Sequence, residues 1–241
     1  MNSSEKDYRK LYSLQDKFLR WWSTLNYPFY LTGGTALGRF YLNHRYSEDL
    51  DFFVNNDKLY PEYIKDLMKK ITGIFNVEIQ ESLFTEDFTR LFICSENTKL
   101  KIELVNDIAY YAGRKAKYIF GYIDTPLNIL SNKLVAIINR DEPKDIYDIL
   151  KISENYSFRW TDIFYHSKQK AVINELDVEE RLATFPAEWL QEVVWLEAPP
   201  EKEFFERRIK QIADDFILGR ENTLGTGKLP IEKARPLINS G

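Results

Sequence analysis

The sequence has few of the residues that build disulfide or zinc frameworks: its 241 residues include one cysteine, Cys94, and two histidines. A lone cysteine has no intramolecular partner, and the chain has no CxxC motif or Cys/His cluster that would indicate zinc. Neither His44 nor His166 has the spacing of a metal ligand, so we expect no catalytic role for them.

Long apolar runs are also missing. None approaches the roughly 18 to 20 residues that a membrane-spanning helix requires. The polar start, residues 1–7, lacks the apolar core of a signal peptide. We therefore expect a cytoplasmic protein with no membrane partner.

An excess of positive charge is absent as well. The chain has 33 Lys plus Arg against 37 Asp plus Glu, a formal net charge of −4. Proteins that coat nucleic acid by bulk electrostatics are usually basic, so the net charge argues against a protein of that kind. A local basic patch is still compatible with a net charge of −4. Hydrophobic residues make up 44% of the chain and charged residues 29%, as in a globular protein, and the length allows one large domain or two small ones.

Hydrophobic periodicity predicts an α+β first half. Helices are expected over residues 8–25, 35–42 and 61–71, and strands over 29–32, 50–54, 77–79, 89–94 and 100–105. Strand 50–54 alternates too little to be half exposed, so we expect it to be central in a mixed sheet.

The second half is predicted to be helical. Apolar residues recur with helical spacing behind Pro126 and Pro143. Further helices are expected at about residues 160–164, 175–182 and 201–218. The last segment is rich in Gly, Pro and charge, which is typical of a tail. We predict a core with a mixed β-sheet over residues 1–125, an α-helical domain over 126–218 and a tail over 219–241.

Two glycines, Gly33 and Gly34, follow a predicted strand and precede a helix. Glycine lets the backbone approach a ligand closely, and the N–H groups at a helix start can cradle a phosphate, although such a pair is more often a tight turn.

Asp49 and Asp51 are two apart on a predicted strand, so both project from one face. Mg²⁺ prefers such hard oxygen ligands. An isolated pair would more often be an exposed strand edge, but apolar neighbours favour a buried strand.

A third acid, Glu103, lies on a later predicted strand, two residues after Lys101. A two-metal site for phosphoryl transfer needs a third carboxylate to complete one ion's shell and orient the attacking hydroxyl. Taken singly, Glu103 would more often be an exposed strand residue. The order of glycine pair, Asp-x-Asp and later acid favours the functional interpretation.

These motifs resemble the nucleotidyltransferase superfamily related to DNA polymerase β. The segments 33–37 (Gly-Gly-Thr-Ala-Leu) and 45–53 (Arg-x-Ser-x-Asp-Leu-Asp-Phe-Phe) look more closely like the AbiEii/AbiGii toxin family. Segments 132–136 and 144–149, with Arg140 between them, resemble that family's helix lysine, arginine, basic-Asp pair and second Asp. The likeness covers roughly residues 30 to 150.

The resemblance implies transfer of a nucleoside monophosphate from an NTP to a hydroxyl. It makes Asp49, Asp51 and Glu103 ligands of Mg²⁺ or Mn²⁺, with Glu103 also activating the hydroxyl, and Lys133 a catalytic contact to phosphate. The residues that it places at the nucleotide are Gly33, Gly34, Thr35, Arg45, Ser47 and Lys133. Further motif residues are Lys101, Asp145 and Asp148. Family members often carry Asp where this chain has Glu103. Glutamate has the same charge as aspartate, but its carboxylate lies one methylene farther from the backbone.

Several roles stay open at this point. Arg45 and Ser47 could face the triphosphate or simply fix their loop, and Asp145 and Asp148 could cap a helix or pair with Arg140. The resemblance implies an active site between the core and the helical half. It also implies an RNA acceptor such as a tRNA end, and a cognate antitoxin. A small-molecule nucleotidyltransferase of the antibiotic-modifying kind, which the net acidic charge suits, and a non-catalytic interaction protein are the alternatives.

Overall fold

Two units with interleaved segments make up the chain in the computed structural model, which describes residues 3–193, 195–196 and 199–237. Unit 1 is formed by the residues up to Ala36, by Ser47–Ala109 and by Lys115–Asp124. Unit 2 is formed by Leu37–Tyr46, Tyr110–Arg114 and the residues from Thr125 onward. The predicted division after residue 125 therefore lies next to the main change of unit. Two short segments from the first half also belong to the helical unit.

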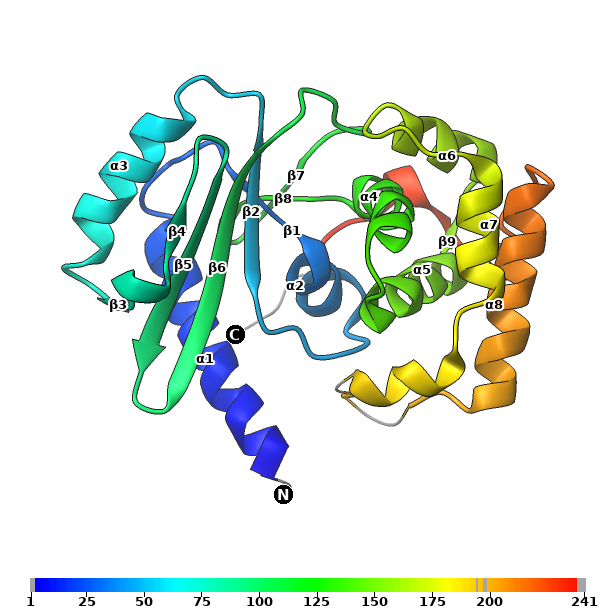
Figure 1. Cartoon of the computed structure of the whole chain (residues 1–241), viewed down its shortest axis with the longest axis horizontal. Helices are drawn as coiled ribbons and strands as arrows, with labels where there is room; N and C mark the ends of the chain where they lie inside the picture. The colour runs from blue at the N-terminus through cyan, green and yellow to red at the C-terminus, as the bar shows by residue number, and fades with distance from the viewer. Residues whose placement is uncertain (1–2, 194, 197–198, 238–241) are drawn as a thin grey trace. The chain divides into compact units, whose positions relative to one another are not determined.

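Unit 1 contains one mixed sheet, with helices α1 (Ser3–Trp22) and α3 (Tyr60–Ile71) on one face (Figure 1). The strands are β1 (Tyr30–Thr32), β2 (Leu50–Asn55), β3 (Asn76–Val77), β4 (Leu83–Phe84), β5 (Phe88–Ser95), β6 (Thr98–Asp107), β7 (Ala116–Tyr118) and β8 (Gly121–Ile123). They are ordered β3-β5-β6-β2-β1-β8-β7, and β4 also pairs with β5. β2 is parallel to β6 and β1 to β8, and the other pairs are antiparallel. The short helices of this unit are α2 (Gly33–Leu37), whose last residue belongs to unit 2, and η2 (Ile79–Glu81).

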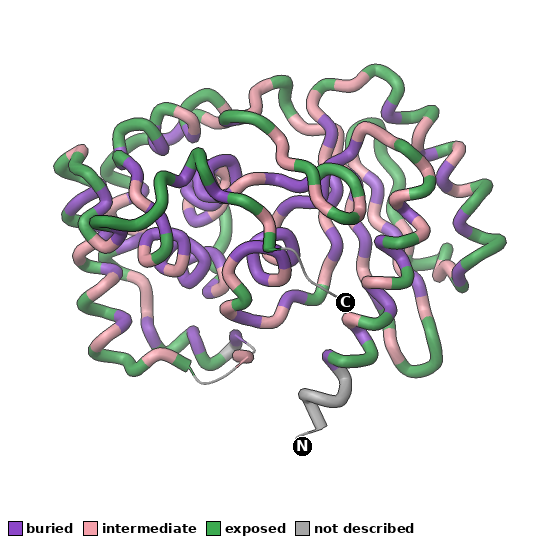
Figure 2. The backbone as a smooth tube through the Cα atoms, turned by 180° about the vertical axis from the view of Figure 1, so that it is seen from behind, coloured by how far each residue is buried: buried purple, intermediate pink, exposed green. Residues whose placement is uncertain are grey.

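Alternation along β2, β5 and β6 separates a buried face of this sheet from a half-exposed one, as the colours in Figure 2 show. The buried face meets α1 and α3. The rings of Phe18 and Phe52 lie 6.1 Å apart, and the Tyr60 hydroxyl donates to the Leu104 carbonyl at 2.9 Å. Each fully buried large side chain contributes about 1.5 to 3 kcal/mol, so this face supplies the core of unit 1. The charged side chains of Asp51, Arg90, Lys101 and Glu103 lie on the other face.

Unit 2 is mostly helical. Its longer helices are α4 (Pro126–Asn139), α5 (Pro143–Asn155), α6 (Trp160–Lys168), α7 (Glu175–Ala183) and α8 (Lys202–Ile217). Shorter elements are η1 (Gly38–Leu42), η3 (Ala187–Glu192), η4 (Thr223–Gly225), η5 (Ile231–Lys233) and the parallel strands β9 (Tyr156–Ser157) and β10 (Leu229–Pro230). Proline opens α4 and α5, where its missing N–H removes no helical hydrogen bond. No helix among the described residues is both long and apolar enough to cross a membrane.

The architecture confirms the α+β prediction, with a mixed sheet in the first half and helices in the second. The segment predicted as a tail, 219–241, is instead packed into unit 2 over its described part, 219–237. Asn222 donates to the carbonyls of Ser153 and Tyr156 at 2.7 and 2.8 Å, and Ile231 is fully buried. Glycine there serves close packing, since a Cβ on Gly225 would come within 1.9 Å of the Tyr156 oxygen. The remaining residues, 238–241, lie outside the described part of the chain.

Candidate active site

Strand pairing brings the predicted carboxylates together on unit 1. In the parallel pair β2–β6, Asp51 lies directly opposite Glu103, and in the antiparallel pair β1–β2 it lies opposite Thr32. Residues opposite each other in a sheet project to the same face. The neighbours Leu50 and Ile102 are fully buried, so the two acids lie on the half-exposed face.

The Lys101 ammonium joins two of the three acids. Its Nζ lies 2.7 Å from Asp49 Oδ2 and 3.6 Å from Glu103 Oε1. Asp49 and Glu103 therefore lie on the same side of the sheet and face one cation. Burial by itself lowers the pKa of Lys101, but the hydrogen bond to Asp49 and the charges of Asp49, Glu103 and Asp51 outweigh it and hold that pKa above its usual value. The ammonium is charged at neutral pH.

Arg90 supplies a second cation at this place. It lies opposite Glu103 in the β5–β6 pair, and its Nε is 2.7 Å from Glu103 Oε1. Within the described ranges, no three His, Cys, Asp or Glu side chains are arranged closely enough to hold a metal ion. The donor set still fits Mg²⁺ chemically, because hard carboxylate oxygens share one accessible face and two of them already gather around a positive charge.

Gly33 packs its backbone against Asp51. Its φ is +69°, in the left-handed region that favours glycine. A Cβ at this position would come within 2.5 Å of Asp51 Oδ2, so any side chain would displace the carboxylate. Gly34 follows as the second residue of α2. The glycine pair thus lies directly beside one of the predicted metal ligands.

Hydrogen bonds fix the loop that leads into β2. The Thr35 hydroxyl donates to the Asp49 carbonyl and lies 2.9 Å from the Ser47 hydroxyl. The Gln15 amide donates to the carbonyls of Ser47 and Glu48 at 3.1 and 2.9 Å. Thr35 and Gln15 are fully buried. The nucleotide contacts expected of Thr35 and Ser47 stay predictions. In the structure the Thr35 hydroxyl holds the backbone carbonyl of Asp49, and the Ser47 hydroxyl contacts that of Thr35.

The sequence motifs do not single out Gln15. It lies four residues after Leu11 and three before Phe18, within the apolar stripe of the predicted first helix. A glutamine on the buried face of a helix needs hydrogen-bond partners, and this was the available signal. Its partners, the backbone carbonyls before Asp49, could not be read from that spacing.

Four of the predicted residues meet in a buried ion network within unit 2. Lys133 Nζ lies 2.5 Å from Asp145 Oδ1 and 2.7 Å from Asp148 Oδ2. Arg45 holds the same Asp148 through Nε and Nη2, each at 2.7 Å. His44 Nε2 lies 2.8 Å from Asp148 Oδ1. Because the side chains of all five are at most 8% exposed, these charges compensate one another away from bulk water.

The pKa values in this network follow from burial set against close charges. Burial raises the pKa of Asp148, but Arg45 and Lys133 outweigh it and hold that pKa well below its usual value. The pKa of Asp145 is lowered in the same way by Lys133 and Arg140. Burial lowers the pKa of Lys133, yet the two aspartates raise it above its usual value. The two aspartates, Lys133 and Arg45 are therefore charged at neutral pH. Burial lowers the pKa of His44 below its usual value, so its imidazole is neutral there.

These contacts bear on the roles expected for the network residues. The resemblance implies a contact between Lys133 and phosphate, and in the structure its ammonium contacts Asp145 and Asp148. Its contact to a phosphate stays a prediction. Arg45 holds Asp148, which agrees with the alternative that it fixes its own segment. His44, for which we expected no role, is a member of the network, and no spacing in the sequence pointed to it.

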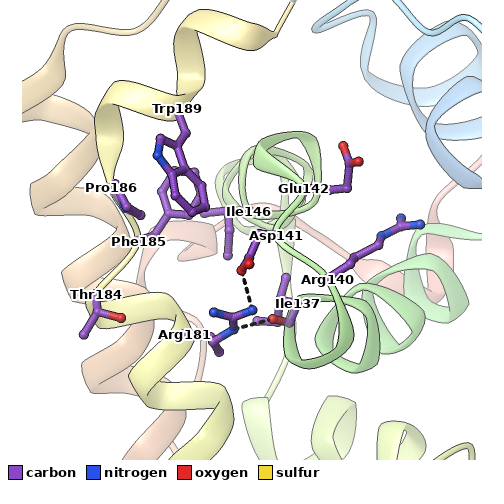
Figure 3. A pocket seen from close by; sticks show the side chains of 10 residues that line it. All are labelled: Ile137, Arg140, Asp141, Glu142, Ile146, Arg181, Thr184, Phe185, Pro186 and Trp189. Atoms are coloured by element: carbon purple, nitrogen blue, oxygen red, sulfur yellow. Dashed lines mark hydrogen bonds and ion pairs between the residues drawn. The ribbon is translucent and has the colours of Figure 1, made fainter.

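A small hollow of about 160 Å³ lies next to the network in unit 2 (Figure 3). Arg181 spans it by donating to the Ile137 carbonyl at 2.7 Å and pairing with Asp141 at 2.5 Å. Arg140, at the rim, reaches Asp145 with its Nε at 2.8 Å. Its walls contain none of the three acids of unit 1, so it is a separate feature.

Comparisons with known proteins agree with the motifs. No curated protein sequence matches the chain. Among solved structures, the chain is similar to JHP933 from Helicobacter pylori, at 20% identity and a TM-score of 0.57, over 90% of this chain and 94% of that one. It is also similar to MenT4, a nucleotidyltransferase toxin from Mycobacterium tuberculosis H37Rv, at 15% identity and a TM-score of 0.65, over 90% and 86% of the two chains.

These structural likenesses support the fold. The family itself follows from the sequence, because the profile described as "Nucleotidyl transferase AbiEii toxin, Type IV TA system" matches residues 18–222. The match extends well beyond the motifs, to most of the helical unit. The chain belongs to the AbiEii nucleotidyl transferase toxin family, as its Gly-Gly and Asp-x-Asp segments predict.

Proposed function

We propose that this protein transfers a nucleoside monophosphate from an NTP to a hydroxyl acceptor, with two divalent cations held by Asp49, Asp51 and Glu103. One observation carries the proposal. Asp49 and Glu103 share the Lys101 ammonium, while Asp51 is in register with Glu103 on the neighbouring strand. Three carboxylates that share one accessible side of the sheet repel one another unless cations lie between them. Phosphoryl transfer uses divalent cations held in this way.

The residues of unit 1 would have different roles in this reaction. Mg²⁺ or Mn²⁺, when bound by the three acids, would neutralise charge on the triphosphate and acidify the acceptor hydroxyl. Gly33 and Gly34 leave space for phosphates beside Asp51, since a Cβ on Gly33 would occupy that place. Their neighbour Thr35 keeps the Asp49 backbone in position. Preorganised groups of this kind avoid reorganisation at the moment of reaction.

The reaction itself is a displacement at phosphorus. The acceptor's hydroxyl oxygen forms a bond to the α-phosphorus, and the bond from that phosphorus to the bridging oxygen of the β-phosphate breaks. Pyrophosphate leaves with the electron pair of the broken bond. The hydroxyl proton passes to the Glu103 carboxylate, which lies on the accessible face of β6. No oxidant or reductant is needed, so the reaction balances with NTP and acceptor alone.

We propose RNA, with a tRNA end as the first substrate to try, as the acceptor. The family's toxin–antitoxin context supports this and implies a cognate antitoxin in the same system. A cationic small molecule is the second candidate, which the formal net charge of −4 favours. Inside the cell, growth inhibition that an antitoxin reverses would accompany the RNA activity.

The test is incubation with each α-³²P-labelled NTP, Mg²⁺ and total RNA, followed by electrophoresis. We expect label in RNA with the wild-type protein and a loss of at least about 100-fold with Asp51→Asn. Asp162→Asn, an exposed aspartate of α6, is the matched control and should behave as wild type. The melting temperature of Asp51→Asn should be equal or higher, because repulsion between neighbouring acids is relieved. Label in RNA with Asp51→Asn at the wild-type rate would contradict the proposal.

A further inference from the structure

Two adjoining hollows on unit 1 are not used by the chemistry described so far. The larger, of about 490 Å³, has Asp49, Lys101, Phe92 and Thr98 among its lining residues. The smaller, of about 260 Å³, shares Thr98. Both lie between α1 and the hairpin formed by β5 and β6. We call the two together the α1–hairpin groove.

One of the three acids of the candidate site, Asp49, lines the groove. Phe92 lies directly opposite Lys101 in the β5–β6 pair, two residues from Arg90, and is half exposed on the same sheet face. Lys101 in turn contacts Asp49 at 2.7 Å. A molecule in the larger hollow therefore meets Asp49 directly. Hollows of about 300 to 1,000 Å³ hold small ligands, so the size suits one nucleotide.

The walls of the larger hollow suit a nucleobase. The Phe92 ring is accessible and has the Lys99 ammonium 4.5 Å from its centre. Leu11 and Tyr8 of α1 supply apolar surface across from it, and the exposed amide of Asn97 offers both a donor and an acceptor. Proteins that bind single strands combine aromatic platforms with cations in this way, since every base has a face that stacks.

The charges of the smaller hollow suit phosphate. Lys10 and Lys17 are exposed residues of α1 in its wall. In the described part of the chain no carboxylate pairs with Lys17, whose ammonium lies 5.5 Å from the centre of the Phe75 ring. The acid in this wall, Glu96, is met by Lys10 at 3.9 Å. In the larger hollow, the carboxylate of Glu48 accepts a hydrogen bond from Tyr8.

We propose that the α1–hairpin groove binds the 3′ end of a single-stranded RNA acceptor. The last base stacks on Phe92, the terminal hydroxyl points toward Asp49, and the preceding phosphates lie along Lys10 and Lys17. This rests on the proposed function for its hydroxyl acceptor. The groove would be the surface that selects the acceptor. Its exposed lysines form a local basic surface on a protein whose net charge is negative.

The test measures RNA binding without turnover. A 5′-fluorescein-labelled 12-nucleotide single-stranded RNA is titrated with full-length protein in EDTA, at several salt concentrations, and followed by anisotropy. We expect K10E/K17E to weaken binding at least about 10-fold and to reduce the salt slope by about 1.4, which is roughly 0.7 for each lost phosphate contact. The matched control is K65E/K69E, two exposed lysines of α3 outside the groove, which should bind as wild type.

Phe92 is tested by a pair of variants that keep the side chain large. Phe92→Leu should weaken binding roughly 10-fold because the stacking ring is lost, and Phe92→Tyr should retain it. Transfer of labelled NMP to the same RNA, without the fluorophore, should follow the same order. Circular dichroism spectra confirm that each variant is folded.

The outcomes separate the groove from the proposed function. RNA binding and transfer that K10E/K17E and Phe92→Leu leave unchanged, while Asp51→Asn abolishes transfer, would overturn the groove and leave the function standing. Groove-dependent RNA binding without transfer to any acceptor would support the groove and count against the function. Absence of RNA binding together with groove-dependent transfer to an aminoglycoside such as kanamycin would overturn the RNA assignment.

Discussion

Replacing Lys133 by Met removes the cation that two buried aspartates share. Met has a similar length, so the change deletes charge and leaves little cavity. Removing one partner of a buried ion pair costs about 3 to 5 kcal/mol, because the other charge stays buried. Here Asp145 keeps Arg140 at 2.8 Å, and Asp148 keeps both contacts to Arg45. We therefore expect the low end of that range, about 3 kcal/mol of lost stability.

The pH dependence of this loss follows from the directions of the pKa shifts. The aspartates have lowered pKa values in the folded protein, so their contribution is present above their usual value of 3.8 and is lost as the pH falls below it. The pKa of Lys133 is raised, so its contribution is present below 10.5 and is lost as the pH rises beyond the folded value. Burial lowers the pKa of His44, which contacts Asp148, so that imidazole is neutral above its usual value of 6.5. The difference between wild type and variant should thus be constant from about pH 7 to 9 and shrink in strong acid.

The assay is urea unfolding followed by circular dichroism, with Lys210→Met as the matched control. Lys210 is also in unit 2 and pairs with Asp214 at 3.1 Å, but its side chain is 73% exposed. Such surface pairs contribute about 0 to 1 kcal/mol. Adding Asp145→Asn to the Lys133→Met variant should restore part of the stability, because it removes an uncompensated charge. Equal midpoints for Lys133→Met and Lys210→Met would refute the buried network.

Three further predictions concern unit 1. Lys101→Met should tighten Mn²⁺ binding at least about threefold in a titration followed by electron paramagnetic resonance, because a competing ammonium is removed; weaker binding would contradict this. Gly33→Ala should lower the free energy of unfolding in urea by about 1 to 3 kcal/mol. It should also lower the rate of NMP transfer at least about 100-fold, because the new Cβ would displace Asp51. An unchanged transfer rate would contradict the contact between Gly33 and Asp51. Gln15→Leu leaves two carbonyls without their buried donor and should cost about 2 kcal/mol in urea unfolding; a neutral effect would show that water replaces the amide.

The elements that the sequence predicts well are long or begin at proline. Helices α4 and α5 start at Pro126 and Pro143, where the helical pattern begins, and β2 covers the predicted strand 50–54 in the centre of the sheet. The expectation that this strand is not half exposed is wrong, because every second residue of β2 is half exposed. Strands β7 and β8 have three residues each, too few for a period of two to be recognised. The packed end of the chain escaped prediction because a Gly- and Pro-rich composition does not distinguish a tail from a close-packed irregular segment.

The site was predictable in its residue types and less so in its contacts. Spacing alone predicts Asp49 and Asp51 on one side of a strand, whereas β2 begins at Leu50 and Asp49 directly precedes it. That Glu103 lies opposite Asp51 depends on strand order and register, which only the folded sheet defines. The contacts of Lys101 depend on the same register, because it brings Asp49 and Glu103 within reach of one side chain. Buried partners such as His44 lie far from Asp148 in the sequence and leave no periodic signal.

The central claim is that Asp49, Asp51 and Glu103 hold divalent cations for nucleotidyl transfer. Mn²⁺ binding, measured by electron paramagnetic resonance in the presence of a non-hydrolysable NTP, tests it most directly. The account predicts two bound ions for each wild-type chain and for the control Asp162→Asn, and weakened or lost binding for Asp51→Asn and Glu103→Gln. Wild-type Mn²⁺ affinity and stoichiometry in both of those variants would contradict it.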